Sequence, residues 1–214
     1  MTTMRRLAPA TMMAGVLAAG ALALGGCALL GGGKPAHLYR FGQSAVGEPG
    51  QPSAPVQSVG VLRTPGPFQR EAAGDRILTV TGGKAAYIAE TRWVAPAQTL
   101  FNQAVVAAFD ANTGPVRLVS RGEPGSAPYA LRLEVRNFES RYDNGSKAAP
   151  VVVIRVAATL SAGQASSVRE RMFETQVRAG DNRVSSIVEA YDGAVAQVLG
   201  EIVAWTNAEA RPTT

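Results

Sequence analysis

The pattern of apolar and polar residues is clearest between positions 129 and 138, where it predicts a half-buried strand. Up to position 135 every second side chain is apolar, and those between are small or charged. A period of two is that of a strand with one face on a core and the other in water. The alternation slips at Asn137-Phe138, which indicates a bulge. The apolar positions are Tyr129, Leu131, Leu133 and Val135.

Two more strands are expected to continue this one as an antiparallel meander. The turn Asp143-Asn144-Gly145-Ser146 contains Asn-Gly, a pair that adopts the positive φ angles of a tight hairpin. Residues 151–160 are rich in β-branched side chains and are expected to run back beside the first strand. After a turn at 161–164, residues 168–177 form a third, more polar strand. We therefore expect the hairpin of residues 129–160 to lie at the centre of the sheet.

Earlier in the chain, shorter apolar runs bounded by Gly and Pro predict further strands. Pro65-Gly66-Pro67 is expected to end one of them, and Thr81-Gly82-Gly83-Lys84 is expected to turn a hairpin. The latter segment shares letters with a phosphate-binding loop, but it lacks the spaced first glycine and no helix follows it. The expected strands cover residues 37–41, 58–63, 76–80, 86–89 and 116–119.

Two segments have the apolar period of an α-helix. The first covers residues 96–110, with Pro96 at the first helical position. The second starts either at a capping box of Ser186 and Glu189 or at Asp181 or Asn182. Its apolar stripe consists of Ile187, Tyr191, Val195, Val198, Ile202 and Trp205. Together the elements predict an α+β fold, with a mainly antiparallel sheet and two helices packed on one face.

The beginning of the chain has the anatomy of an export signal. Arg5 and Arg6 precede a run without charged residues from Leu7 to Gly33. Within this run, Leu24-Gly25-Gly26-Cys27 resembles the lipobox of bacterial lipoproteins, which are cut before the cysteine and lipidated on it. Cys27 is the single cysteine of the chain, and its thiolate would be a strong nucleophile. We expect Cys27 to carry the fatty acyl groups, palmitate among them, that anchor the chain.

The same uncharged run is long enough for a membrane-spanning helix. Its many Ala and Gly residues, with Pro9 and Thr11, make it only moderately hydrophobic. The lipoprotein interpretation is preferred because the cysteine falls where export signals are cleaved. The predicted division is a signal peptide at 1–26, a lipidated tether at 27–36, a single domain at 37–207 with a flexible Pro/Gly loop at 43–56, and a frayed tail at 208–214.

Charge and cysteine content narrow the possible partners. The formal net charge is +5 at pH 7, but Lys and Arg do not cluster along the sequence, and we therefore exclude nucleic-acid binding. Once Cys27 is lipidated, no thiol remains for a disulfide, even in an oxidising compartment. The domain must then be held together by packing alone.

The sequence contains no recognisable catalytic or metal-binding pattern. His37 is the only histidine, and its place next to the tether is a poor one for a general base. The sequence lacks the His-Glu-x-x-His, Cys-x-x-Cys and Gly-x-Ser-x-Gly patterns, and its acidic residues lack metal-ligand spacing. We expect no enzyme activity, no cofactor and no metal. Trp93 and Trp205 could form a ligand platform, but their apolar neighbours favour a place in the core.

Several landmarks, in this order, resemble those of a known family. They are Tyr39-Arg40-Phe41, Val59-Gly60-Val61-Leu62, Arg92-Trp93, the strand from Tyr129 to Glu139 and the closing helix that ends at Trp205. Following a lipobox, they resemble the ABC-type transport auxiliary lipoproteins, the PqiC-like lipoproteins that accompany MCE-domain lipid transport systems. The stretch from Gly42 to Pro55 and the segment from Pro65 to Asp75 depart from the family pattern.

This resemblance implies a non-catalytic lipoprotein on the periplasmic face of the outer membrane. The implied partners are an MCE-domain protein and ABC transporter components, which move lipid between the inner and outer membranes; a homo-oligomer is left open. Ala28, and not an aspartate that would favour the inner membrane, follows the cysteine. Two other functions stay open: a structural outer-membrane lipoprotein that assists assembly of another membrane protein and, less favoured, a small secreted hydrolase.

Partner contacts are expected on exposed strand edges, because an open edge offers unpaired backbone groups. Tyr39 and Phe41, on the expected edge strand nearest the tether, are the predicted partner-binding residues. The nine residues from Cys27 to Pro35 span at most about 30 Å when fully extended. The body is therefore expected to stay close to the membrane that anchors it.

Overall fold

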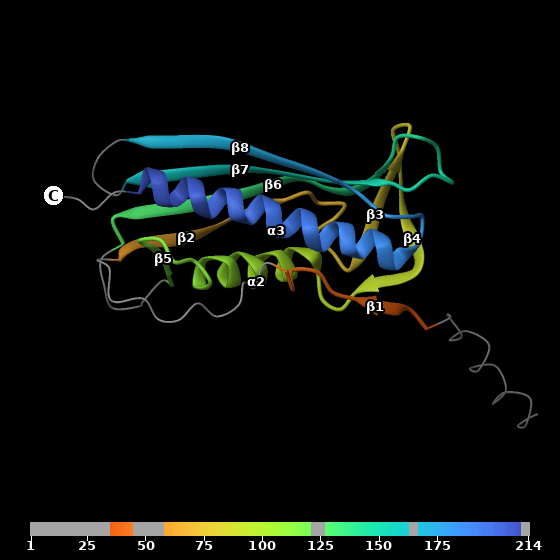
Figure 1. Ribbon diagram of the computed structural model, residues 1–214, viewed down its shortest axis with the longest axis horizontal. Helices are drawn as coiled ribbons and strands as arrows, with labels where there is room; N and C mark the ends of the chain where they lie inside the picture. Colours follow the sequence, from red (N-terminus) through yellow and green to blue (C-terminus); the bar gives the residue numbers. More distant parts are fainter. Residues whose placement is uncertain (1–34, 45–57, 121–126, 163–166, 211–214) are drawn as a thin grey trace, which may run out of the picture. The chain divides into compact units, whose positions relative to one another are not determined.

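The computed structural model describes residues 35–44, 58–120, 127–162 and 167–210. From Ala36 onward these residues form eight strands and two helices, and both helices lie on the same side of the sheet (Figure 1). The strands are β1 (His37–Tyr39), β2 (Val59–Phe68), β3 (Arg76–Thr81), β4 (Lys84–Trp93), β5 (Val116–Val119), β6 (Tyr129–Tyr142), β7 (Val151–Ala162) and β8 (Val168–Arg178). The helices are α2 (Ala97–Asp110) and α3 (Val184–Glu209).

Strand β6 is the centre of the sheet. One of its edges pairs antiparallel with β7, and β7 pairs antiparallel with β8. The other edge is shared end to end, because residues 129–135 pair with β2 and residues 140–142 pair with β3. The predicted meander and its central hairpin are therefore confirmed.

The prediction of a mainly antiparallel sheet is wrong. Four of the seven strand pairings in the described residues are parallel: β1–β4, β2–β5, β2–β6 and β3–β6. Parallel neighbours need a long connection that returns the chain to the same end of the sheet. Between β2 and β5 the β3–β4 hairpin and α2 supply it. The apolar pattern identifies a strand but contains no information about such distant partners, so the α+β class holds while the pairing does not.

Strand β2 continues through Pro65-Gly66-Pro67, where the sequence predicted its end. Its register with β6 shifts between Pro65 and Phe68, which accommodates prolines that cannot donate to the ladder. Glycine is required between them, because a Cβ on Gly66 would lie 2.0 Å from the carbonyl oxygen of Leu133. These turn-forming residues therefore mark a close approach of two strands.

The predicted bulge in β6 is confirmed between Val135 and Asn137. Gln69, just after β2, bonds to the bulged backbone: its N–H donates to Val135 O (2.8 Å), and its Oε1 accepts from the N–H of Phe138 (2.7 Å). Its Nε2 also donates to the carboxylate of Glu139 (3.1 Å). These backbone groups lie on the edge of β6 between the residues paired with β2 and those paired with β3, and Gln69 satisfies them there.

Both helices begin close to their predicted starts. Pro96 is the N-cap of α2, and the helix proper starts one residue later than predicted. Helix α3 starts at Val184, before the predicted capping box, and no side chain caps it. The alternative start signal, Asp181, lies closer to the observed start of the helix. Its carboxylate accepts the N–H of the N-cap residue Arg183 (2.9 Å).

The end of α3 corrects the predicted tail at 208–214. The helix runs through Glu209, and Ala210 is only 1% exposed. The frayed-tail prediction is therefore wrong for residues 208–210, and residues 211–214 lie outside the described residues. The sequence misled because Ala and Glu on the final turn lack the large apolar side chains that mark buried helix positions.

A cluster of aromatic rings forms the core between the sheet and the helices. Phe138 is at its centre, with ring centroids 5.0 Å from Tyr191, 5.1 Å from Phe41 and 5.3 Å from Phe68. Trp93 is 2% and Trp205 is 8% exposed, so the prediction that both tryptophans belong to the core is confirmed. Neither of the described helices is long and apolar enough to cross a membrane.

Candidate docking surfaces

The residue predicted to carry the lipid anchor is Cys27. Cys27 and the tether up to residue 34 lie outside the described residues, as do residues 45–57 of the predicted Pro/Gly loop. The first described element after the tether is β1. The lipidation of Cys27 therefore stays a prediction.

Tyr39 lies on β1, which pairs in parallel with β4. Its register partner is the buried Trp93, and its own side chain is half-buried against the core. Its carbonyl oxygen accepts the N–H of Val94 (2.8 Å), which extends the pairing beyond the strand ends. Tyr39 is therefore an edge-strand residue as expected, but its ring points toward the core. Its role as a partner contact stays a prediction.

Phe41 does not lie on the surface. It is 2% exposed, and its ring packs edge-on against Trp93 at a centroid distance of 4.9 Å. A side chain in this position cannot reach a partner, and the prediction for Phe41 is corrected accordingly. Alternation along residues 37–41 places positions 39 and 41 on one face, and the structure shows that this face is the one toward the core.

The chain after Phe41 is fastened to α3 by Asp192. One carboxylate oxygen accepts the N–H groups of Gly42 (2.6 Å) and Gln43 (2.8 Å), and the other accepts the N–H (3.2 Å) and hydroxyl of Ser44. Gly42 has a φ of +86° and lies against Ala104, where a Cβ would come within 3.0 Å. Sequence reasoning missed this clamp because its two halves are 150 residues apart.

Among the polar side chains buried in the described residues, the hydroxyl of Thr175 has no hydrogen-bond partner, whereas Glu139, Ser140 and Tyr191 have structural ones. Glu139 accepts hydrogen bonds from Gln69 and from Arg141, whose Nη2 lies 2.6 Å away. The hydroxyls of Ser140 and Tyr191 are 3.3 Å apart, and burial raises the pKa of Tyr191, so this phenol stays protonated. Within the described ranges, no group of three or more His, Cys, Asp and Glu side chains could hold a metal ion.

The open face of the sheet, on the side away from the helices, has a trough of about 360 Å³ between β6 and β8. Ala157 and Thr159 of β7 form part of its floor, and Arg132, Glu134, Glu170 and Met172 line its sides. Two ion pairs lie on this face: Glu134 with Arg136 (3.1 Å) and Arg155 with Glu174 (2.6 Å). Hydrogen bonds from Gln176 and then from Arg155 lower the pKa of Glu174.

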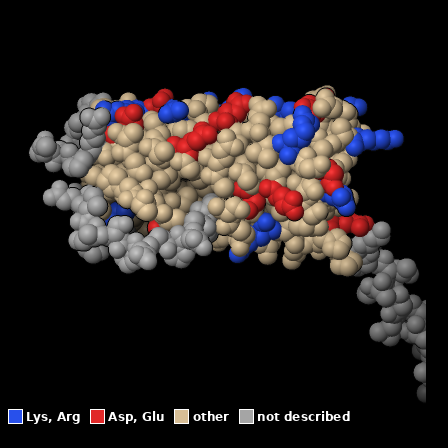
Figure 2. Space-filling view, viewed as in Figure 1, with Lys and Arg blue, Asp and Glu red and all other residues tan. Residues whose placement is uncertain are grey.

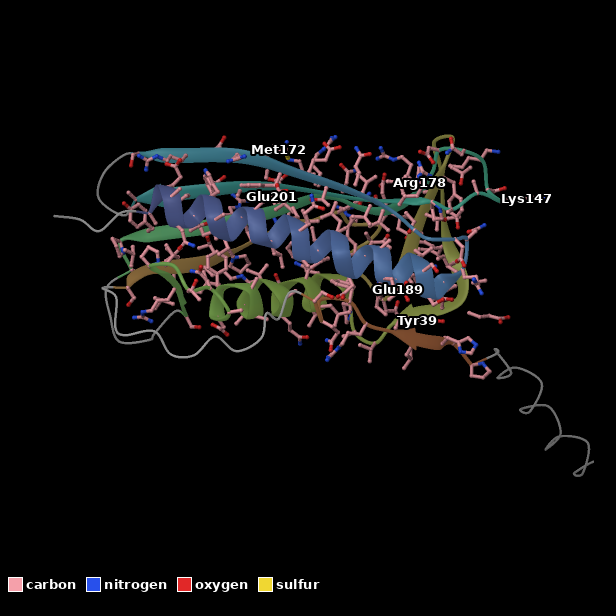
Figure 3. The ribbon with its side chains drawn as sticks, in the orientation of Figure 1. Tyr39, Lys147, Met172, Arg178, Glu189 and Glu201 are labelled. Carbon is pink, nitrogen blue, oxygen red and sulfur yellow. The ribbon has the colours of Figure 1, made fainter. Side chains whose placement is uncertain are left out.

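Strand β8 is an edge of the sheet beside this trough. In the described part of the chain it pairs with β7 and with no other strand, so its second edge offers backbone groups for pairing. Val168 is 59% and Met172 is 43% exposed. Figure 3 labels Met172 and Arg178 along this strand and Tyr39 on β1, at a different edge of the sheet. Strand β8 thus combines an open edge with accessible apolar side chains.

A groove of about 520 Å³ separates α2 from the inner side of β2 and β5. Val106 and Leu118 line it, and the half-buried Arg63 donates from Nη1 to the carbonyl oxygen of Asn102 (3.4 Å) and from Nη2 to its side-chain oxygen. Burial lowers the pKa of Arg63. Residues 45–57 and 121–126, which connect to the strands of its walls, lie outside the described residues.

The sequence of residues 45–203 matches the ABC-type transport auxiliary lipoprotein component family. This match spans well over half of the chain, and the chain belongs to that family. The resemblance inferred from the landmarks is thereby confirmed. Membership defines a lipoprotein that is an auxiliary component of ABC-type transport.

Solved structures support the same fold. A protein from Xanthomonas campestris is similar to this chain with a TM-score of 0.65 and 26% sequence identity, over 80% of this chain and 95% of that one. A protein described only as uncharacterised has a TM-score of 0.61 and 15% identity, over 80% of this chain and 99% of its own. No curated protein matches the sequence.

Proposed function

We propose that the chain is a non-catalytic, lipid-anchored subunit of an ABC/MCE-type system that moves lipid between the inner and outer membranes. The observation that carries the proposal is its membership of the ABC-type transport auxiliary lipoprotein component family. The lipobox-like segment at Cys27 supports a membrane anchor, and Ala28 after it supports the periplasmic face of the outer membrane. Because the family is defined as an auxiliary component of transport, binding is favoured over catalysis as the function of this chain.

The proposed activity is the binding of an MCE-domain partner along β8. An extended segment of the partner would add a strand to the open edge, where main-chain hydrogen bonds give affinity and neighbouring side chains give specificity. Strand β8 has 11 residues and β1 has three, so β8 offers the longer edge. Met172 and Val168 would contact the partner's apolar side chains. This edge replaces Phe41 as the proposed contact, and Tyr39 is kept as the rival position.

Photo-crosslinking in intact cells tests this function. A photoreactive amino acid is placed at Met172, at Tyr39 and, as a control on the helix layer, at Glu201. The mature lipoprotein is then purified and its crosslinked partners are identified. We expect an MCE-domain protein from the Met172 position and little from Glu201. Recovery from Tyr39 alone would move the docking edge to β1 and leave the function in place.

Recovery of a β-barrel assembly partner, without an MCE protein at any position, would overturn the transport proposal. It would favour the alternative of a structural outer-membrane lipoprotein that assists assembly.

A matched pair of substitutions sharpens the test: Met172→Lys on β8 and Val106→Lys on α2, where the native side chains are 43% and 40% exposed. Only Met172→Lys is expected to weaken capture of the MCE protein, and neither should alter thermal unfolding much.

A further inference from the structure

A second surface combines exposed apolar and basic side chains around β1, the first element after the tether. We call it the anchor patch, and it consists of Leu38, Arg40, Arg76, Arg92 and Val94. In the parallel register of β1 and β4, Leu38 is beside Arg92 and Tyr39 is beside Trp93. Because Tyr39 and Trp93 face the core, Leu38 and Arg92 face away from it. Arg76 is the partner of Arg92 on β3, which extends the row across three strands.

The apolar part of the patch is unusually accessible. Leu38 is 63% and Val94 is 49% exposed, and Leu38 is the most exposed large apolar side chain in the described residues. The hydrogen bond from the N–H of Val94 to the carbonyl oxygen of Tyr39 (2.8 Å) holds the two segments together beyond the strand ends. The two aliphatic side chains therefore occupy fixed positions on neighbouring segments.

The patch also has an excess of positive charge. Arg92 is neutralised by Asp75, with an Nη1–Oδ2 distance of 2.9 Å. Arg40 and Arg76 are exposed, and the guanidinium of Arg76 lies 3.8 Å from the ring centroid of Tyr87. Aliphatic groups flanked by arginines form the combination that holds protein surfaces at an anionic membrane interface.

We propose that the anchor patch lies on the bilayer to which Cys27 is lipidated, with Leu38 and Val94 among the headgroups and Arg40 and Arg76 against lipid phosphates. This inference rests on the lipid anchor of the proposed function. The nine residues from Cys27 to Pro35 reach at most about 30 Å. They lead directly into β1, so the patch is the part of the domain that the anchor keeps nearest to the membrane.

Such a contact would orient the domain. Strand β1 and strand β8 lie at opposite ends of the strand order β1-β4-β3-β6-β7-β8. With β1 against the membrane, β8 would face the periplasm, where a partner from the inner membrane could reach it. The bilayer contact and the proposed docking edge are therefore compatible within one orientation.

Lipid-borne quenching of site-attached fluorophores tests the contact. The lipidated chain is placed in phosphatidylethanolamine–phosphatidylglycerol vesicles, with one cysteine introduced by Leu38→Cys, Val94→Cys, Val106→Cys or Met172→Cys and labelled with the fluorophore. Cys27 is blocked by its lipid and does not react. We expect headgroup-attached quenchers to reduce emission at positions 38 and 94 at least about threefold more than at 106 and 172. Equal quenching at all four positions would overturn the proposal.

The charge contribution is tested with the double variant Arg40→Gln and Arg76→Gln. On anionic vesicles the double variant is expected to lower the equilibrium constant for contact about tenfold or more, since each arginine near an anionic surface adds to the attraction. On neutral phosphatidylcholine vesicles the change should be small. A matched double variant of Arg132→Gln and Arg136→Gln, on the open sheet face, should leave quenching unchanged.

Insensitivity of the quenching to both arginines and to lipid charge would overturn the assignment of phosphates as their ligands. Labels at 38 and 94 that stay exposed on vesicles but become shielded when an MCE protein is added would overturn the bilayer contact and assign the patch to a protein. Quenching on vesicles before any MCE protein is added requires no transport component, so that result is independent of whether the transport proposal holds.

Discussion

The face of the sheet beneath the helices buries apolar side chains, whereas the face open to solvent exposes charged ones. On the covered face, Leu131 and Phe138 of β6 are at most 1% exposed and belong to the core, where the ring of Phe138 packs against Phe101 of α2 and Tyr191 of α3. On the open face, the charged side chains of the same strand form pairs in water, such as Glu134 with Arg136 (3.1 Å). Burial of apolar surface stabilises the fold far more than such exposed pairs do.

The outer surface of the helix layer differs from both faces. The charged residues of α2 and α3 are all acidic: Asp110, Glu189, Asp192, Glu201 and Glu209. Over the visible side of the helix layer, Figure 2 shows a broad uncharged surface, and Glu189 and Glu201 are labelled on α3 in Figure 3. Stability therefore resides mainly in the covered face, and changes on the open face can test binding without unfolding the domain.

Phe138→Ala is expected to cause the largest loss of stability. Phe138 contacts four other rings of the cluster and is 1% exposed. Its truncation should lower the free energy of unfolding by about 3–5 kcal/mol, because it leaves a cavity in the core. Urea denaturation measures this loss, and a change below about 1 kcal/mol would show that the aromatic cluster does not hold the layers together.

Leu133→Ala is expected to have the next largest effect. Leu133 is 8% exposed on the covered face of β6 and is the register partner of Pro65. We expect a loss of about 2–3 kcal/mol, at the low end for a buried leucine. Native-state hydrogen exchange in the wild type should show strong protection from Leu131 to Val135, and rapid exchange there would contradict the central place of β6.

Asp192→Asn removes the charge that holds Gly42, Gln43 and Ser44. Hydrogen bonds to charged groups contribute about 1.5–3 kcal/mol when buried, and this partly exposed site should lose about 1 kcal/mol. The amides of residues 42–44 should exchange faster in the variant. Glu189→Gln, on the exposed surface of the same helix, is the control and should leave them unchanged; equal effects of the two variants would exclude a specific clamp.

Glu174→Gln on the open face is expected to have the smallest effect at neutral pH, within about 1 kcal/mol, because exposed ion pairs contribute little. Its pH dependence is more informative. Gln176 and Arg155 lower the pKa of Glu174 in the folded state, so its contribution is present above the unfolded-state pKa of about 4 and is lost as the pH falls through the folded value.

Below about pH 5, stability should therefore fall less steeply with decreasing pH for Glu174→Gln than for the wild type. Circular dichroism of both proteins along an acid titration measures this difference. Arg155→Gln should also make the fall in stability less steep, because it removes one of the groups that lower the pKa of Glu174. Curves that coincide with the wild type would show that the pair on the open face does not couple to folding.

The sequence predicted strands and helices well where their period was regular. The alternation of β6, its bulge, the β3–β4 hairpin and the stripe of α3 are local features, and the structure confirms them. Parallel pairing of β2 with β5 and β6 could not be predicted, because it depends on the path of the chain between distant segments.

The candidate site was harder to predict than the fold. The burial of Phe41, two residues after β1, depends on which face of this segment meets the core, and the clamp by Asp192 depends on a contact with α3. A short strand with weak alternation does not identify its buried face. The open edge of β8 follows from the order of strands in the whole sheet, which no local pattern contains.

The most direct test of the central claim is the movement of lipid between membranes in cells that lack this chain. Phospholipid is pulse-labelled at the inner membrane, and its arrival in the outer membrane is followed in deletion cells with no chain, with the wild type or with Cys27→Ala. The proposed function predicts slowed exchange in deletion cells, restored by the wild type and not by Cys27→Ala. Exchange that is the same with and without the wild-type chain would contradict it.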